Sequence, residues 1–391
     1  MNAFNKIFKC CLGASLSNEQ ISLSLEFTDV KIDHRKSYSM EVITSNTYNN
    51  TIYNHTFDVL NKLKESNQDT KSRISFDSGK RLKFDINGQL EELYIDNCTI
   101  DNIPIQFGLL TNIVSIWMSN NNISMLPETI TSLINLKHLW LNNNNFDSVP
   151  YLPKNIECLY MFNNPIVTLI RIGTCVNLVK LYINDCELQS LCEEITELKQ
   201  LQILECHCNE LIELPSYIGE LTNLKHVSLH SNFLKTLPKE IGELNQLNWL
   251  SLHFNELSRL PPEFGKLKNL TRLSLHWNKL ENLPKEFGNC KALQVVSLFN
   301  NYLVTIPDEV YMNLQNCIKL SLHNNHIDIV SPLIKNMISL EDIWLWGNKF
   351  LELPNELIEL PNIKNIYLCE KNNEHFNFNN IRENNKNIAI V

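Results

Sequence analysis

An apolar pattern that returns about every 23 residues, from Leu90 to Leu368, constrains the fold more than any other feature. One copy, Leu224 to Leu244, reads LKHVSLHSNFLKTLPKEIGEL. Its alternating apolar positions predict a short strand, because alternate side chains of a strand point to the same face. The later Ile-x-x-Leu spacing predicts a short helix, and the proline before it fits a first-turn position. A single copy cannot bury its apolar edge, so the copies must stack around one continuous core.

The copies place the repeat domain at residues 90–368 and predict about 12–13 repeats. They begin at Leu90, Ile113, Leu136, Ile156, Leu178, Leu201, Leu224, Leu247, Leu270, Leu293, Cys317 and Leu340, with a partial copy at Ile363. The third copy is short, and its segment Val149-Pro-Tyr-Leu-Pro153 departs from the pattern. Because neighbouring strands lie about 4.8 Å apart, twelve strands predict an arc on the order of 55 Å.

Two columns of the repeat predict how its turns and helices are held. A carboxamide can donate and accept at once, so asparagines directly after each strand should satisfy the backbone of the turns. These asparagines are Asn121, Asn144, Asn164, Asn209, Asn232, Asn255, Asn278, Asn301, Asn325 and Asn348. Cys98 and Cys186 take this position in two copies. A second column holds Gly219, Gly242, Gly265 and Gly288, from which we infer close packing between helices.

The pattern LxxLxLxxNxLxxLPxxIGxLxx resembles leucine-rich repeats, in particular the 23-residue class of Ras-group proteins such as the Scribble and Erbin scaffolds. The likeness covers about 280 residues. It implies an α/β fold, a right-handed superhelical horseshoe with a parallel concave sheet and short convex helices. It also implies a solenoid that binds proteins on the concave sheet. The departing third copy is closer to the shorter bacterial-type unit.

Composition restricts the partners and the compartment. The net charge of −9 and a pI near 5.7 disfavour nucleic acid, because phosphate binding needs a basic face. The twelve cysteines form no compact framework, and we expect a reduced, cytoplasmic (intracellular) protein. No stretch of the sequence approaches a membrane span. Cys10 and Cys11 could carry a lipid and tether the chain peripherally to a membrane, although two reduced cysteines in a flexible arm are the preferred interpretation.

The segments outside the repeats are predicted to cap the stack. Residues 1–70 form either a small cap or a partly disordered arm, with strand-like alternation in Ile21–Phe27 and helical spacing in Phe57–Leu63. Residues 71–89 should add a capping strand through Ile74–Phe76 and Leu82–Phe84. Residues 369–391 should form a C-terminal cap or tail whose Ile388-Ala-Ile-Val391 shields the last open edge. We expect a monomeric solenoid.

Variable columns on the strands are the predicted partner-binding surface, because Trp and Tyr are frequent among binding hot spots. The candidate residues are Tyr94, Trp117, Trp140, Tyr160, Tyr182, His207, His230, Trp249, His253, His276, Trp277, His323, Trp344 and Trp346. They divide the face into an aromatic amino-terminal third, a Ser/His middle and a Trp-capped end. The alternative is that the rings pack on each other and only stabilise adjacent strands.

The histidine column raises three further possibilities. A straight ladder of imidazoles does not converge on one ion, so no metal and no cofactor are predicted. Protonation should weaken binding or local packing below about pH 6.5, because neighbouring imidazolium charges repel. Catalysis lacks support, because we expect the Ser and His columns to be exposed and to lack an orienting carboxylate at a matching position.

The sequence therefore predicts a non-enzymatic scaffold or adaptor that binds a partner protein of unknown identity. The resemblance suggests small-GTPase or phosphatase signalling. A pathogen-effector or immune-type recognition module is the alternative.

Overall fold

The computed structural model describes residues 50–67, 81–368 and 389–390. The predicted strand at Ile21–Phe27, the lipidation candidates Cys10 and Cys11, and the Ile74–Phe76 part of the capping strand lie outside the described residues.

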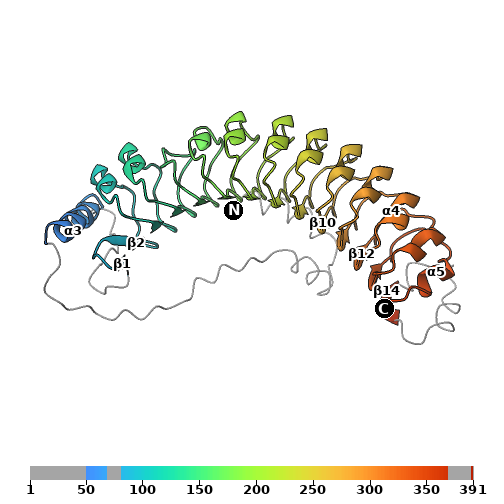
Figure 1. The fold of residues 1–391 in the computed structure, drawn as a ribbon. Coiled ribbons are helices and arrows are strands. Elements are labelled where there is room, and N and C mark those ends of the chain that lie inside the picture. The colour runs from blue at the N-terminus through green and yellow to red at the C-terminus, as the bar shows by residue number, and fades with distance from the viewer. Residues whose placement is uncertain (1–49, 68–80, 369–388, 391) are drawn as a thin grey trace.

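The described strands form one sheet in chain order, in which β1 is antiparallel to β2 and every later pair is parallel. The strands are β1 (Leu82–Phe84), β2 (Leu90–Tyr94), β3 (Ser115–Trp117), β4 (His138–Trp140), β5 (Cys158–Tyr160), β6 (Lys180–Tyr182), β7 (Ile203–Glu205), β8 (His226–Ser228), β9 (Trp249–Ser251), β10 (Arg272–Ser274), β11 (Val295–Ser297), β12 (Lys319–Ser321), β13 (Asp342–Trp344), β14 (Asn365–Tyr367) and β15 (Ala389–Ile390). The sheet follows the inner side of an arc and the helices follow the outer side (Figure 1). The predicted solenoid is confirmed.

Most outer-face helices are single turns of 3-10 helix rather than α-helix. They are η2 (Ile105–Leu109), η3 (Glu128–Ser132), η4 (Ile172–Thr174), η5 (Glu193–Glu197), η6 (Ser216–Glu220), η7 (Lys239–Glu243), η8 (Pro262–Lys266), η9 (Lys285–Asn289) and η10 (Pro332–Asn336), with α4 (Asp308–Asn313) and α5 (Asn355–Ile358) as short α-helices. The proline of the repeat is mostly the N-cap, as at Pro238, one residue earlier than the sequence suggested. The third copy has turn and extended backbone in place of a helix, and buries Val149 and Leu152.

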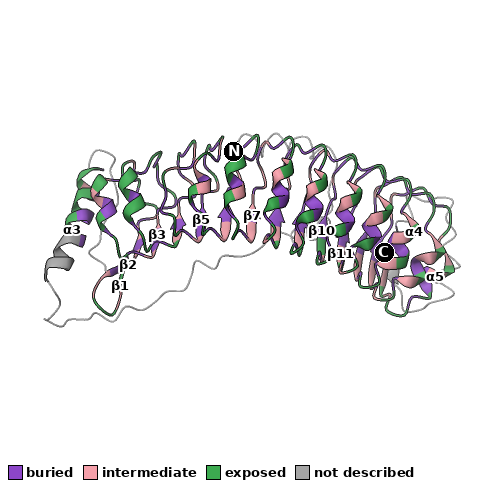
Figure 2. Ribbon diagram, turned by 45° about the horizontal axis from the view of Figure 1, so that its top comes forward, coloured by how far each residue is buried: buried purple, intermediate pink, exposed green. Residues whose placement is uncertain are grey.

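Buried residues recur on the strands and helices along the whole arc (Figure 2), and their apolar side chains form one core. Leu250 and Leu252 of one copy and Ile241 of the preceding helix are all fully buried. Each copy contributes the same positions, so the core continues from one end of the arc to the other. A stack of this kind is stabilised mainly through contacts between neighbouring copies.

The asparagine ladder closes the turns between copies. Asn255 accepts a hydrogen bond from the Leu234 backbone N–H at 3.0 Å, and its amide donates to the Leu229 and Leu252 carbonyls, both at 3.0 Å. One side chain thereby joins two copies and satisfies buried backbone groups, as a carboxamide can. Cys98 replaces it in the first copy, and its thiol donates to the Asp96 carbonyl at 3.2 Å.

The glycine column marks direct contact between successive helices. A Cβ atom added to Gly265 would lie 2.2 Å from the backbone oxygen of Glu286 in the next copy. Gly242 meets Glu263 in the same way, at 2.3 Å. These distances are far below van der Waals contact, so only glycine permits the spacing.

A helix and a strand cover the two ends of the stack. Helix α3 (Asn50–Glu65) buries Val59, Leu60 and Leu63 against the first copy. Asn67 follows it and fixes the contact, because its side-chain oxygen accepts from the backbone N–H groups of Asp101 and Asn102 at 2.9 and 3.0 Å. At the other end, β15 pairs in parallel with β14, so residues 389–390 cover the last strand.

Candidate protein-binding face

Five aromatic rings from successive strands stack along the amino-terminal third of the concave sheet. Parallel register places Trp117 beside Trp140, and Trp140 beside Tyr160. The ring centroids are 4.2 Å apart for Tyr94 and Trp117, and 4.3 Å apart for Trp117 and Trp140. Trp140, Tyr160 and Tyr182 continue the stack at 5.0 and 4.4 Å. These five residues are called the aromatic ladder below.

Stacking hides much of each ring without removing the ladder from the surface. Tyr94, Trp117, Trp140 and Tyr182 are half-buried, and Tyr160 is buried. The Trp140 indole Nε1 is buried and has no hydrogen-bond partner. Burial raises the pKa of the Tyr182 hydroxyl, and the neighbouring Tyr160 raises it further. The tryptophans are therefore less exposed than the sequence suggested, and the ladder is a packed, uncharged strip.

A second stack follows along the Ser/His middle and is called the histidine ladder below. It contains His207, His230, His253, His276, Phe299, His323 and Trp346. Its neighbouring centroids are 4.2 to 4.4 Å apart. His253, His276 and His323 are buried, with 1% of His276 exposed. The predicted partner-binding set therefore includes members that the surrounding side chains cover, and Trp344 is buried as well. In this middle and carboxyl part of the face, the half-buried members are His207, His230, Trp249, Trp277 and Trp346.

Burial keeps the covered histidines neutral. It lowers the pKa of His276 and of His323 to about 3, and for His276 the neighbouring histidines add a smaller effect. The pKa of His253 lies well below its usual value for the same reasons. The sequence suggested that repulsion between imidazolium charges would act below about pH 6.5. In the folded protein, desolvation is instead the main cause of the lowered pKa values, and the covered rings stay neutral to a lower pH.

The Ser–His pairs have hydrogen-bonding geometry but no access to a substrate. Ser251 Oγ lies 2.8 Å from His253 Nδ1, and Ser274 Oγ lies 2.9 Å from His276 Nδ1. Both serines are buried, in contrast to the exposed pairs expected from the sequence. His276 Nε2 has no hydrogen-bond partner, so no carboxylate orients this ring. These pairs pack the sheet and lack the features of an activated nucleophile.

The boundary between the two ladders carries the one carboxylate of the Ser column. Glu205 Oε1 lies 2.5 Å from His226 Nε2, and Glu205 Oε2 lies 3.8 Å from His207 Nε2. The His226 ring in turn stacks on Trp249 with centroids 3.9 Å apart. Two imidazoles thus hold this carboxylate in place at the centre of the face.

The carboxyl end of the face repeats the aromatic pattern. Trp344 stacks on Tyr367 at 4.7 Å, and Trp346 stacks on His323 at 4.4 Å. Trp277 stacks on Phe254 at 5.5 Å beside the histidine ladder. The predicted tryptophans therefore lie in three separate groups along the arc.

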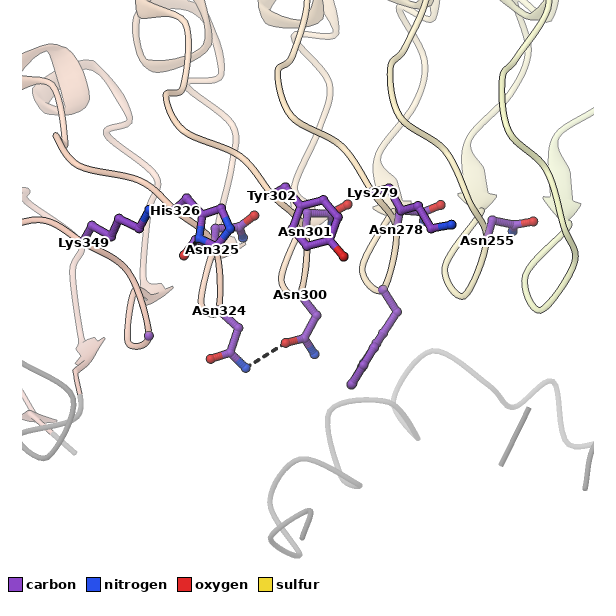
Figure 3. A pocket seen from close by; sticks show the side chains of 12 residues that line it. Asn255, Asn278, Lys279, Asn300, Asn301, Tyr302, Asn324, Asn325, His326 and Lys349 are labelled. Atoms are coloured by element: carbon purple, nitrogen blue, oxygen red, sulfur yellow. Dashed lines mark hydrogen bonds between the residues drawn. The ribbon is translucent and has the colours of Figure 1, made fainter. Parts of the chain in front are cut away.

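An open groove of about 620 Å³ runs along the turns beside this end of the face. Figure 3 shows Lys279, Tyr302, His326 and Lys349 following one row along the groove. Below that row the Asn324 amide donates to Asn300 Oδ1 at 2.7 Å. The groove adds hydrogen-bonding groups and two lysines at the rim of the concave face.

The cysteines of the described residues are all free. Burial raises the pKa of the Cys208 thiol to about 12, and Asp185 raises it further. Burial also raises the pKa of Cys290 to about 12. These thiols are protonated at neutral pH and are poor nucleophiles. Cys208 is close to two ladder histidines: ligand atoms of His207, Cys208 and His230 lie within 4.8 Å of one another.

The fold and this geometry agree with the known proteins that the chain resembles. The sequence matches the Leucine rich repeat family over residues 222–280, 245–303 and 135–156. No protein of curated function matches it in sequence. A leucine-rich repeat protein of Leptospira interrogans has a similar structure, with a TM-score of 0.60 and 27% identity, over 85% of this chain and 98% of the other.

Two receptors have the same fold over most of this chain. The ectodomain of the Arabidopsis thaliana membrane receptor kinase GASSHO1/SCHENGEN3 is 24% identical with a TM-score of 0.62, over 78% of this chain and 38% of its own length. A TDR receptor is 25% identical with a TM-score of 0.63, over 72% of this chain and 51% of its own.

These matches and the fold support a leucine-rich repeat protein, a class whose members generally act in protein–protein interaction or recognition. The described helices include none that is both long and apolar enough to cross a membrane.

Proposed function

We propose that this chain is a non-enzymatic scaffold or adaptor that binds a protein partner on its concave sheet. The aromatic ladder is the observation that carries the proposal. Four of its five rings, Tyr94, Trp117, Trp140 and Tyr182, keep exposed surface on a sheet whose other face is the buried core. Large aromatic side chains dominate the energetics of protein interfaces. The GASSHO1/SCHENGEN3 ectodomain, which shares this fold, was solved in complex with CASPARIAN STRIP INTEGRITY FACTOR 2, so a solenoid of this kind can hold a ligand.

Stacking and binding are compatible roles for these rings. The Trp117 and Trp140 rings are held 4.3 Å apart and 11° from parallel before any partner arrives. A side chain that is already ordered loses little conformational entropy on binding. The stack that stabilises the strands therefore also prepares a rigid apolar platform.

The charges on the face favour recognition through shape and hydrogen bonds. Glu205 is engaged by His226, and Lys319 lies 3.9 Å from Asp342. Glu92 pairs with Lys83. The cationic residues Lys180, Arg272 and Lys319 equal the acidic residues Glu92, Glu205 and Asp342 in number, so the face offers little net charge for steering a partner. An elongated partner along the arc, or separate partners at its two aromatic ends, would fit.

The cellular setting follows from weaker indications. The 23-residue Ras-group pattern favours a role in small-GTPase or phosphatase signalling, and the free buried cysteines favour a reducing, cytoplasmic setting for a monomer. We assign binding to residues 90–368, with residues 50–67 as part of an N-terminal cap. The alternative is a pathogen-effector or immune-type recognition module, and the fold shared with two receptors is compatible with a recognition role.

Affinity purification with the full chain tests this proposal. Wild type is compared with a Trp117→Ala/Trp140→Ala variant and with Tyr151→Ala, which removes an exposed ring on the third copy's outer segment. Partners recovered by wild type and Tyr151→Ala, and lost from the double variant, would support the concave site. Equal recovery of the same partners by all three chains would show that the aromatic ladder is only structural.

A further inference from the structure

Three side chains with metal-ligand chemistry meet where the histidine ladder begins. His207 follows strand β7, and His230 occupies the same position one copy later, with centroids 4.2 Å apart. Cys208 follows His207 in the left-handed backbone region, with a φ of 53°. In the part of the chain that the structure describes, these three residues are the one group of His, Cys, Asp and Glu whose ligand atoms lie within 4.8 Å of one another.

The ring nitrogens of this group are available to a ligand. His207 Nε2 faces Glu205 at 3.8 Å, while His207 Nδ1 is buried and has no hydrogen-bond partner. A buried polar atom of this kind is costly unless something pairs with it. His230 Nδ1 contacts only the Ser231 hydroxyl, at 3.1 Å, which an ion could displace. All three residues are half-buried, unlike the covered histidines further along.

Cys208 differs from the residues that occupy the same turn position in the other copies. The residue after each ladder histidine is Ser231, Phe254, Trp277 or Asn324 in the other copies, and only His207 is followed by a thiol. Asp185 occupies the same turn position in the preceding copy and interacts with the Cys208 side chain. A carboxylate is therefore placed beside the thiol as a further oxygen donor.

We propose that His207, Cys208 and His230 bind a zinc ion, with Asp185 or water as the fourth ligand. Zinc takes imidazole and thiolate ligands at about 2.0–2.3 Å, so a tetrahedral site needs ligand atoms roughly 3.3–3.6 Å apart. The ligand atoms therefore have to come about 1 Å closer to one another when zinc binds. Rotation of the two imidazoles provides this, because their terminal torsions are soft. The thiol proton passes to solvent as the sulfur–zinc bond forms.

This assignment changes one expectation from the sequence. Parallel imidazoles alone do not converge on an ion, which still holds for His253 and His276. The third ligand comes from the turn column beside the ladder, and it approaches from outside the row of rings. The site can be tested separately from the aromatic ladder, because it uses none of the five residues of that ladder.

Calorimetric titration of the untagged, reduced full chain with zinc chloride tests the site. We expect one equivalent of zinc to bind, and Cys208→Ser to weaken binding at least about tenfold, since even outer-shell changes cost that much. Serine occurs at this turn position in the next copy, and asparagine in several others, so Cys208→Asn is a second variant compatible with the backbone. Cys192→Ser, at a partly buried thiol that is the N-cap of helix η5, is the matched control and should bind zinc as wild type does.

Cobalt substitution gives an independent measurement. Cobalt(II) bound to the wild-type chain should show a thiolate-to-metal charge-transfer band that both Cys208 variants lose and Cys192→Ser keeps. Absence of saturable zinc binding by the wild-type chain would overturn the proposal. Unchanged zinc affinity in both folded Cys208 variants would also overturn it, because the ion would then bind elsewhere.

Discussion

Acid should destabilise this protein through its covered histidines well before its carboxylates titrate. His276 and His323 have pKa values of about 3 in the folded chain, against about 6.5 for an unfolded one. Between these values the unfolded state binds protons that the folded state does not. Stability is therefore complete above about pH 6.5 and is lost progressively as the pH falls toward 3.

The loss at pH 5 can be worked out for each ring. A group with a pKa of about 6.5 when unfolded, and well below 5 when folded, costs about 2 kcal/mol at pH 5 relative to pH 7.5. The size hardly depends on the folded pKa once that value is below about 4, because the folded ring is then neutral throughout. Together the two rings should lower the free energy of unfolding by about 4 kcal/mol.

Urea unfolding at pH 7.5 and pH 5.0 measures this effect, with His276→Phe as the matched variant. Phe299 already occupies the same ladder beside Ser297, so the fold accepts phenylalanine next to a serine of this column. The variant should lose about 2 kcal/mol less than wild type between the two pH values. Equal losses for the two proteins would refute the assignment of the pH effect to buried, neutral histidines.

Three substitutions test how the repeats are held together. Asn255→Ala removes four buried hydrogen bonds and should cost at least about 2 kcal/mol by urea unfolding, and a wild-type midpoint would contradict its role in closing the turns. Gly265→Ala should destabilise by about 1–3 kcal/mol, because its Cβ would meet the Glu286 oxygen at 2.2 Å, whereas a gain in melting temperature would contradict that contact. Leu252→Asp should cost several kcal/mol through an unpaired buried charge, and unchanged thermal stability would disprove the register.

The sequence predicted the fold because each copy repeats the same physical requirements. The strand at Trp249–Ser251, the asparagine at Asn255 and the close approach at Gly265 each follow from one column of the alignment. The type of outer helix did not follow, because the five residues after Pro238 suit a 3-10 turn as well as an α-helical turn. The packing between neighbouring copies decides whether a 3-10 or an α-helical turn forms, and the sequence of one repeat does not specify that packing.

The sequence predicted which strand positions carry the aromatic and histidine ladders, but it did not predict how far each ring is buried. The columns correctly placed Trp117 beside Trp140, since parallel register follows from the repeat. The columns could not show that His276 is covered, because covering depends on the ring-to-ring distance and on Phe254 and Phe299 around it. The approach of Cys208 to His207 and His230 was missed because they lie in different columns. The sequence did contain one indication of this cluster: Cys208 is the thiol in a turn column that otherwise holds Asn, Asp, Ser, Gly and aromatic residues.

The affinity of the concave face for its partner is the most direct test of the central claim. The dissociation constant of the main protein recovered by affinity purification should be measured against wild type, Trp117→Ala/Trp140→Ala and Tyr151→Ala. The double variant should bind at least about thirtyfold more weakly, the factor for one hot spot of about 2 kcal/mol, and Tyr151→Ala should bind as wild type does. Equal dissociation constants for wild type and a folded double variant would contradict binding through the aromatic ladder.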